Sequence, residues 1–219
     1  RPPLRRDQAG LSAMLGQRVI TAVVLLALLL PALFAESAWP FASLTLAFIV
    51  AGGWEWGRLN GLPLRSSLLL GGVAGALALA LAALKEPAGV CRACDGTALL
   101  WLLGGLFALR LGPAGWGRLP AVLRVAVGPL LLATAWLALV RAHALGINFL
   151  LSVLCLVWVA DISAYAGGRL LGRHKLAPTI SPGKTWEGAL AGVAGVLLLG
   201  LAWWAGDRHF EAASPGLAT

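Results

Sequence analysis

Long apolar segments recur along the whole chain, and they constrain its fold more than any other feature. Residues 23–30 are all Val, Leu or Ala, and several runs approach the 18 or so residues needed to cross ~30 Å of hydrocarbon. Lipid cannot satisfy backbone N–H and C=O groups, so such segments must be helices or the strands of a closed barrel. Barrel strands alternate apolar and polar residues, and residues 23–30 do not. The sequence therefore predicts an all-α, polytopic transmembrane helical bundle.

The composition excludes a soluble globular domain. Hydrophobic residues make up 59% of the chain and charged residues 12%, with a mean hydropathy of +0.86. A soluble domain carries about 25% charged residues, so too little polar surface remains here to face water. The net charge of +8 is compatible with nucleic acid, but the basic residues lie in short connections between apolar runs. We therefore expect the lipid bilayer as a partner and no nucleic acid.

We expect seven spans in one integral membrane domain over residues 1–219. The second and fourth spans are the weakest, because they are short and are interrupted by Gly52-Gly53 and Gly104-Gly105. Gly71-x-x-x-Gly75 and Gly188-x-x-x-Gly192 would let helices approach closely. The predicted spans cover residues 18–35, 38–53, 66–84, 97–111, 121–140, 146–167 and 188–206.

The basic residues also predict an orientation. With the N-terminus in the cytoplasm, thirteen Lys and Arg residues fall on cytoplasmic segments and four on the opposite side. This excess favours a cytoplasmic N-terminus and places the polar loop 168–187 in the cytoplasm. Cys91-x-x-Cys94 then falls in an outside loop. Because two further ligands for zinc are missing there, we interpret these cysteines as a redox pair or two free thiols.

The sixth predicted span carries polar residues on one face. Asp161, Tyr165 and Arg169 are four apart and line up on a helix. Asp161 and Arg169 lie about 12 Å apart along the axis, which is too far for a direct ion pair and suits a metal ion and an anion. An intramembrane acid is costly to keep, which favours a functional role. The alternative is that Asp161 pairs with a base on another helix and only fixes packing.

The following polar segment predicts an anion site. Ser181-Pro182 is typical of a helix start, with Ser as N-cap and Pro at the first helical position. Lys184 would then lie in the first turn, where a cation is unfavourable unless an anion such as phosphate offsets it. The alternative is an ordinary basic loop against anionic lipid. Other basic residues in this segment are Arg169, Arg173, His174 and Lys175.

Two other residues or motifs in this segment allow alternative interpretations. Gly183-Lys184-Thr185 invites a P-loop interpretation, which fails because Pro178 stands where that motif needs a glycine. Glu187 is compatible with three roles: a metal ligand, a partner of a basic residue, or a plain first-turn acid.

At these residues the chain resembles bacterial phosphatidate cytidylyltransferase, also called CDP-diacylglycerol synthase. A shorter and weaker similarity lies in Trp54-Glu55-Trp56-Gly57-Arg58-Leu59. The specific resemblance runs through Ala160-Asp161-Ile162-Ser163-Ala164-Tyr165, Gly172-Arg173-His174-Lys175-Leu176-Ala177-Pro178 and Ser181-Pro182-Gly183-Lys184-Thr185-Trp186-Glu187-Gly188.

The resemblance implies an Mg²⁺-dependent nucleotidyltransferase of phospholipid biosynthesis. In that reaction CTP and phosphatidic acid give CDP-diacylglycerol and pyrophosphate, in the bacterial cytoplasmic (inner) membrane and in a homodimer. The implied catalytic residues are Lys184 and Asp161, and the implied metal ligands are Asp161 and Glu187. The implied substrate-binding residues are Arg169, Lys175, Ser181, Lys184 and Thr185.

The family also carries a C-terminal signature with His-Gly-Gly and Asp-Arg-x-Asp elements, which this sequence lacks. We therefore expect a fragment, a truncated gene model or a degenerate copy, and an inactive relative is one alternative function. The others are a transporter or channel and a non-catalytic scaffold. Spans one, three and seven carry no ionisable residue in their interiors, and the polar residues gather at one predicted cytoplasmic edge. This distribution favours interfacial chemistry over a transport path.

Overall fold

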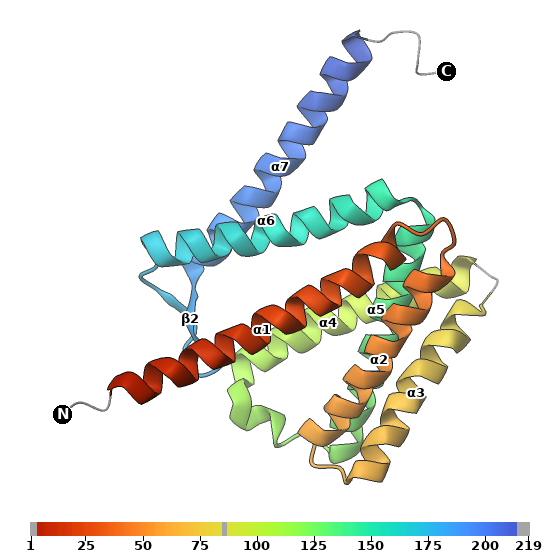
Figure 1. Cartoon of the computed structure of the whole chain (residues 1–219), viewed down its shortest axis with the longest axis vertical. Coiled ribbons are helices and arrows are strands. Elements are labelled where there is room, and N and C mark those ends of the chain that lie inside the picture. Colours follow the sequence, from red (N-terminus) through yellow and green to blue (C-terminus); the bar gives the residue numbers. More distant parts are fainter. Residues whose placement is uncertain (1–3, 85–86, 214–219) are drawn as a thin grey trace. The chain divides into compact units, whose positions relative to one another are not determined.

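Helices make up most of the chain in the computed structural model (Figure 1). The structure describes residues 4–84 and 87–213, with the side chains at 4–15, 18, 87–94, 108, 111, 113 and 207–213 outside the description. Within these residues there are seven helices and one β-hairpin. They are α1 (Leu4–Leu33), α2 (Trp39–Leu59), α3 (Leu64–Ala82), α4 (Pro87–Trp116), α5 (Ala121–Ala144), α6 (Ile147–Leu171), β1 (Lys175–Ala177), β2 (Ser181–Thr185) and α7 (Trp186–Ala213).

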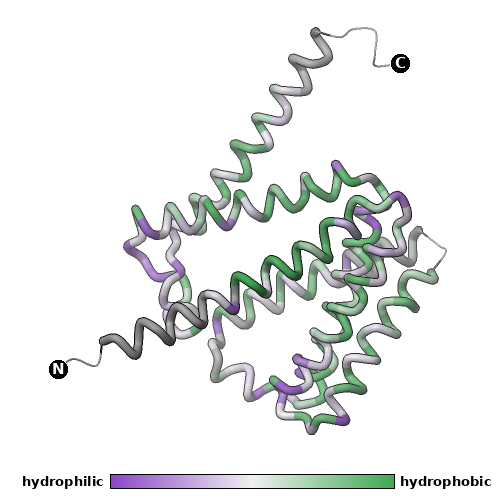
Figure 2. Tube along the Cα trace, viewed as in Figure 1, coloured by the Kyte–Doolittle hydropathy of each residue, from purple (hydrophilic) through white to green (hydrophobic). Residues whose placement is uncertain are grey.

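The predicted multi-pass helical membrane fold is confirmed. Within the part of the chain that the structure describes, four helical segments are long and apolar enough to cross a membrane: α3, α5, α6 and residues Trp186–Gly206 of α7. Shorter apolar segments are Val19–Leu33 of α1 and Asp95–Phe107 of α4. The predicted first, second and fourth spans, which correspond to α1, α2 and α4, are not among the four. Figure 2 shows apolar residues along the helices and hydrophilic residues gathered in the connections.

The chain divides into two units, and the prediction of a single domain stays a prediction. The first unit comprises residues 1–90 and 125–147, which contain α1, α2, α3 and α5. Its core is Ile49, Ala74, Ala78, Ala133 and Trp136. The Trp136 indole N–H donates to the Ala42 carbonyl and lies equally close, at 3.1 Å, to the Thr45 hydroxyl. This contact satisfies a buried polar group and ties α5 to α2.

Small residues bring α2 and α3 together, and the two helices run side by side in Figure 1. A Cβ added at Gly71 would lie 2.5 Å from the Val50 carbonyl oxygen, and one at Gly75 would lie 2.8 Å from the Val50 side chain. The close helix approach predicted from Gly71-x-x-x-Gly75 is therefore confirmed. In lipid, such contacts replace the hydrophobic driving force, which does not operate between helices there.

The second unit comprises residues 91–124 and 148–219, which contain α4, α6, the hairpin and α7. Helices α6 and α7 cross on glycine and alanine. A Cβ at Gly188 would lie 2.8 Å from the Ala164 carbonyl oxygen, and one at Gly192 would lie 3.1 Å from the Ala160 carbonyl oxygen. The close approach predicted from Gly188-x-x-x-Gly192 is confirmed as well.

The predicted helix start at Ser181-Pro182 is wrong. Ser181 lies in β2 and pairs with Ala177 of β1 in an antiparallel hairpin. Helix α7 begins at Trp186, and the Thr185 hydroxyl accepts a hydrogen bond from the Gly188 N–H at 3.2 Å. Thr185 is therefore the N-cap, and Lys184 precedes the helix instead of lying in its first turn. Pairing with β1 keeps Ser181 extended, and a second capping residue four positions later starts the helix.

The segment around Cys91 and Cys94 also differs from its prediction as a loop. It is helical, because α4 begins at Pro87. Their side chains lie outside the description, and the thiol assignment stays a prediction. Helix α4 is interrupted at Gly112, whose φ of 64° and ψ of −173° are not helical.

The α2–α3 contact predicts different effects for two adjacent glycines. Gly71→Ala should destabilise the fold by about 1–3 kcal/mol, because the added methyl group meets the α2 backbone. Gly72→Ala should be neutral or stabilise by up to about 1 kcal/mol, because nothing lies within 4 Å of its Cβ position and Ala favours a helix. Thermal unfolding in detergent micelles measures both. Equal destabilisation by the two variants would contradict this packing.

Candidate functional site

The hairpin between α6 and α7 carries most of the predicted site residues. Lys175 is opposite Thr185, Ala177 is opposite Ser181, and the register is irregular between these pairs. The Ile180 N–H donates to the Ala177 carbonyl at 3.1 Å and closes the turn. The Trp186 N–H donates to the His174 carbonyl at 3.0 Å. The ladder therefore continues to the first residue of α7 and joins the end of the hairpin to that helix.

The turn of the hairpin lies against the break in α4. A Cβ at Gly112 would lie 3.1 Å from the Thr179 hydroxyl oxygen. Gly112 has a positive φ, which glycine adopts without the strain of other residues. The hairpin is thus anchored at its turn as well as at its base.

Two lysines on the hairpin differ in their surroundings. The Lys175 ammonium donates to the Pro182 carbonyl at 2.7 Å, which holds its side chain across the hairpin. Lys184 is exposed and forms no ion pair with another residue in the described part of the chain. Both side chains keep a positive charge free to meet an anion. A phosphate group is well suited to them, since an ammonium acts on phosphate as a point charge.

Thr185 is buried, with 6% of its surface exposed. Its hydroxyl caps α7 at the Gly188 N–H. A Cβ at Gly172 would lie 2.9 Å from the Thr185 methyl group, and one at Gly168 would lie 3.2 Å from its hydroxyl. The residue thus packs between the end of α6 and the start of α7. Its substrate-binding role stays a prediction, whereas its capping and packing roles are visible.

Glu187 lies in the first turn of α7 and accepts hydrogen bonds from the link between α6 and β1. The backbone N–H of Arg173 donates to Oε2 at 3.1 Å, and that of His174 lies 3.2 Å from both oxygens. His174 Nδ1 lies 2.6 Å from Oε1, and the contact becomes an ion pair when the imidazole is protonated. Of the three roles considered for Glu187, these contacts favour a partner of a basic residue, which is His174.

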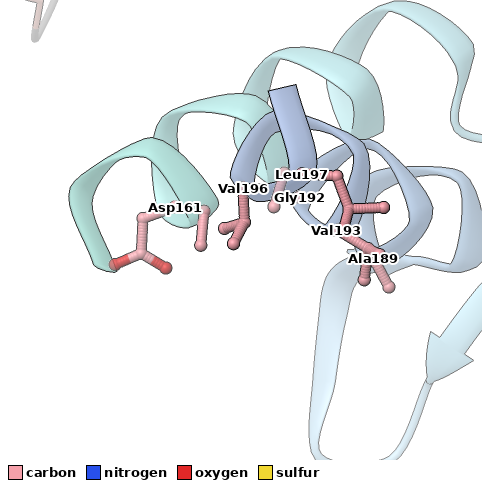
Figure 3. Close-up of a pocket in the computed structure, with 8 residues that line it drawn as sticks. Asp161, Ala189, Gly192, Val193, Val196 and Leu197 are labelled. Carbon is pink, nitrogen blue, oxygen red and sulfur yellow. The ribbon is translucent and has the colours of Figure 1, made fainter. Parts of the chain in front are cut away.

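The predicted polar face of α6 is present. The Arg169 guanidinium donates to the Tyr165 hydroxyl at 2.9 Å, as expected for residues four apart. Asp161 lies further back on the helix and is exposed. It borders a groove of about 380 Å³ between α6 and α7, whose other lining residues are Ala, Gly, Val and Leu. Figure 3 shows Asp161 on α6 at one edge of this group, with Gly192, Val193 and Val196 on α7.

The alternative role for Asp161, pairing with a base on another helix, has no support in the described residues. No ion pair of Asp161 is found among them, and Arg169 is bound to Tyr165. The exposed Asp161 carboxylate, which has no ion pair among the described residues, is available to a ligand.

Two carboxylates were predicted to bind a metal, and they fit it unequally. No group of three or more His, Cys, Asp or Glu side chains that could hold a metal lies among the described residues. Mg²⁺ needs few protein ligands, since one or two carboxylates with substrate phosphates and water complete its octahedron. Asp161 fits such a site. Glu187 fits less well, because three donors already use most of the acceptor sites of its carboxylate.

The structure brings Lys175, Ser181, Lys184, Thr185 and Glu187 into one hairpin and helix start, and leaves Asp161 separate along α6. Sequence reasoning placed His174 among basic loop residues but missed its contact with Glu187. It also missed the Arg173 and His174 amides as donors. No sequence spacing relates residues 13 and 14 positions apart across a hairpin.

Comparison with known proteins is consistent with this arrangement. Residues 16–212 match the model of the cytidylyltransferase family. The phosphatidate cytidylyltransferase of Pseudomonas aeruginosa is 36% identical over 83% of this chain and 67% of its own length. That of Haemophilus influenzae is 32% identical over 85% of this chain and 71% of its own length. The phosphatidate cytidylyltransferase of Brucella abortus is 46% identical over 26% of this chain and 21% of its own. No solved structure matches the chain. The chain therefore belongs to the cytidylyltransferase family.

Proposed function

We propose that this protein is a phosphatidate cytidylyltransferase, which transfers CMP from CTP to phosphatidic acid. The products are CDP-diacylglycerol and pyrophosphate. Membership of the cytidylyltransferase family and the names of two relatives matched over most of the chain support this activity. The structural observation that supports the proposal most is the basic hairpin between the apolar helices α6 and α7. Such a site can meet a nucleotide and the headgroup of a lipid together.

The chemistry requires charge neutralisation more than covalent catalysis. A phosphate oxygen of phosphatidic acid attacks the α-phosphorus of CTP, and the bond from that phosphorus to the β-phosphate oxygen breaks. Pyrophosphate leaves with the electron pair. Lys184 and Lys175 neutralise phosphate charge, and Arg169 and the Ser181 hydroxyl offer further donors. Lys184 is exposed to an incoming anion and is not bound across the hairpin as Lys175 is.

The proposal includes Mg²⁺, with Asp161 as the carboxylate that would hold it directly or through water. The ion supplies charge neutralisation of the triphosphate. Asp161 lies on α6 about two helical turns before Arg169. The proposed Mg²⁺ site is therefore separate from the basic side chains that would bind phosphate. This separation suits CTP, whose triphosphate can extend from one site to the other.

The setting of the reaction is also proposed. The hairpin faces the cytoplasm, where CTP is found, in the bacterial cytoplasmic (inner) membrane. The excess of Lys and Arg on that side of the predicted topology supports this orientation. The family resemblance adds a homodimer to the proposal. A transporter would instead move a solute without making a lipid nucleotide, and flux into proteoliposomes would reveal it.

Removal of one hairpin cation tests the proposed phosphate role. Lys184→Ala should lower CMP transfer by about 10²–10³-fold, because the transition state loses a charge that neutralises phosphate. Transfer is measured as label moving from α-³²P-CTP into the lipid phase with phosphatidic acid in mixed micelles. Arg141→Ala is the control, since Arg141 is an exposed cation in the last turn of α5, in the other unit. Unchanged transfer by Lys184→Ala would contradict the role of Lys184. Absence of transfer by the unaltered chain would contradict the proposed activity.

Neutralising Asp161 tests the proposed metal role. Asp161→Asn should raise the Mg²⁺ concentration for half-maximal transfer about tenfold or more, because an amide oxygen binds Mg²⁺ less tightly than a carboxylate. Titration of Mg²⁺ at saturating CTP gives this value. Added Mg²⁺ should restore part of the rate. A rate that falls without any change in the Mg²⁺ titration would show that Asp161 acts in another way.

A further inference from the structure

We propose that Glu187 is a positioning residue, which holds the link between α6 and β1 and thereby sets where Lys175 and Lys184 lie. It acts through Arg173 and His174 and does not bind the metal. The inference rests on the proposed function and adds to it a residue that touches neither substrate nor ion. It also replaces a metal-ligand role that the sequence suggested for the same side chain.

The contacts of the carboxylate carry the inference. Two consecutive backbone N–H groups, at Arg173 and His174, converge on it at 3.1 and 3.2 Å. The ring of His174 adds a third donor at 2.6 Å. Hydrogen bonds to a carboxylate are stronger than those between neutral groups. One side chain therefore binds three groups of a link that is only three residues long, residues 172–174.

The Glu187 contacts lie at the base of the hairpin, where they can fix the positions of the two lysines. Glu187 is one residue past the start of α7, and its partners lie between the end of α6 and the start of β1. The neighbouring bond from the Trp186 N–H to the His174 carbonyl joins the same two segments. The carboxylate thus ties together the three elements that meet at the base of the hairpin. Lys175 directly follows His174, and Lys184 lies three residues before Glu187.

A shift at this base moves both lysines. Reactions that depend on placed charges are sensitive to displacement, and a 1 Å error can cost about 10²-fold in rate. The link is exposed, with the His174 side chain 79% accessible, whereas the Glu187 side chain is half-buried at 22%. Water can therefore replace the lost hydrogen bonds when Glu187 is removed. The expected result is a folded protein with poorly placed lysines.

The same contacts argue against metal binding by Glu187. A carboxylate has about four acceptor sites, and three donors, the Arg173 and His174 amides and the His174 ring, already use most of them. Nor does Glu187 pair with Lys184, since its ion pair in the described residues is with His174. A metal ion at these oxygens would compete with the anchor of the link.

The test compares Glu187→Ala, Glu187→Gln, His174→Ala and the double variant Glu187→Ala/His174→Ala in the intact chain. Glu187→Ala should lower kcat about 10–100-fold with KM for CTP changed less than threefold, since placement matters most in the transition state. Glu187→Gln, which keeps an acceptor oxygen, should recover most of that loss. The Mg²⁺ concentration for half-maximal transfer should stay within twofold in all four variants. A tenfold rise in that concentration for Glu187→Gln would overturn the inference in favour of metal binding.

The histidine variants test the path of the effect. His174→Ala removes one of three donors and should cost about 2–5-fold, and the double variant should be no slower than Glu187→Ala alone. If the losses of the two single variants multiply in the double variant, the inference is overturned. Should Glu187→Ala fail to fold, Glu187→Gln and His174→Ala still decide the outcome through the same readouts.

A measurement without turnover separates this inference from the proposed function. Hydrogen–deuterium exchange should speed up at least tenfold at the amides of residues 173 and 174 in Glu187→Ala, with residues 190–200 of α7 unchanged. Unchanged exchange at 173 and 174 would overturn the anchoring contact. Absence of CMP transfer by the unaltered chain would overturn the proposed function, even where the exchange result shows that the anchor exists. Normal transfer by Glu187→Ala would overturn the inference alone.

Discussion

Hydrocarbon offers no partner to a backbone N–H or C=O group, and the rest of this structure depends on that constraint. Apolar segments must form helices, in which each backbone group is satisfied internally. Non-helical backbone with its own pairing is then confined to polar stretches. In the described residues the strands occur at 175–177 and 181–185, in the stretch where charged and hydroxyl side chains gather. The hairpin of residues 175–185 is therefore where backbone can turn and polar side chains can gather, and it is the candidate site for cytidylyltransferase chemistry.

Packing between apolar helices uses small residues instead of large ones. Gly71 lets α3 reach the backbone of α2, and Gly188 lets α7 reach the backbone of α6. The second contact matters for the site as well as for stability. The crossing of α6 and α7 brings the end of one helix beside the start of the other, so Thr185 can cap α7 while packing on the glycines of α6. A wider crossing would separate the link from the carboxylate of Glu187.

The charges of the site divide into those held by the protein and those left for a ligand. Glu187 is bound by the link, and Lys175 is partly held by the Pro182 carbonyl. Lys184 and Asp161 form no ion pair in the described part of the chain. A basic site beside apolar helices that keeps such groups free is suited to a nucleotide and an acidic lipid. The bound groups supply rigidity, which a reaction driven by charge placement needs.

Periodicity and hydropathy determined the helices, because a membrane-spanning helix is specified by its own apolar residues. All seven predicted spans correspond to helices, and the polar face of Asp161, Tyr165 and Arg169 followed from spacing alone. The motif around Lys184 was enough to indicate the family. Spacing also located four of the glycines at close helix contacts, which are Gly71, Gly75, Gly188 and Gly192.

Only the tertiary structure decided where α7 starts. The sequence predicted Ser181 as the N-cap, but Ser181 pairs with Ala177 across the hairpin, and Thr185 caps the helix instead. The partner of Glu187 was decided in the same way. Its contact with His174 spans 13 residues, and such a contact depends on the path of the hairpin between them. Local sequence determines elements whose stabilising groups lie within one or two turns, whereas contacts across a turn of variable geometry exist only once the chain has folded.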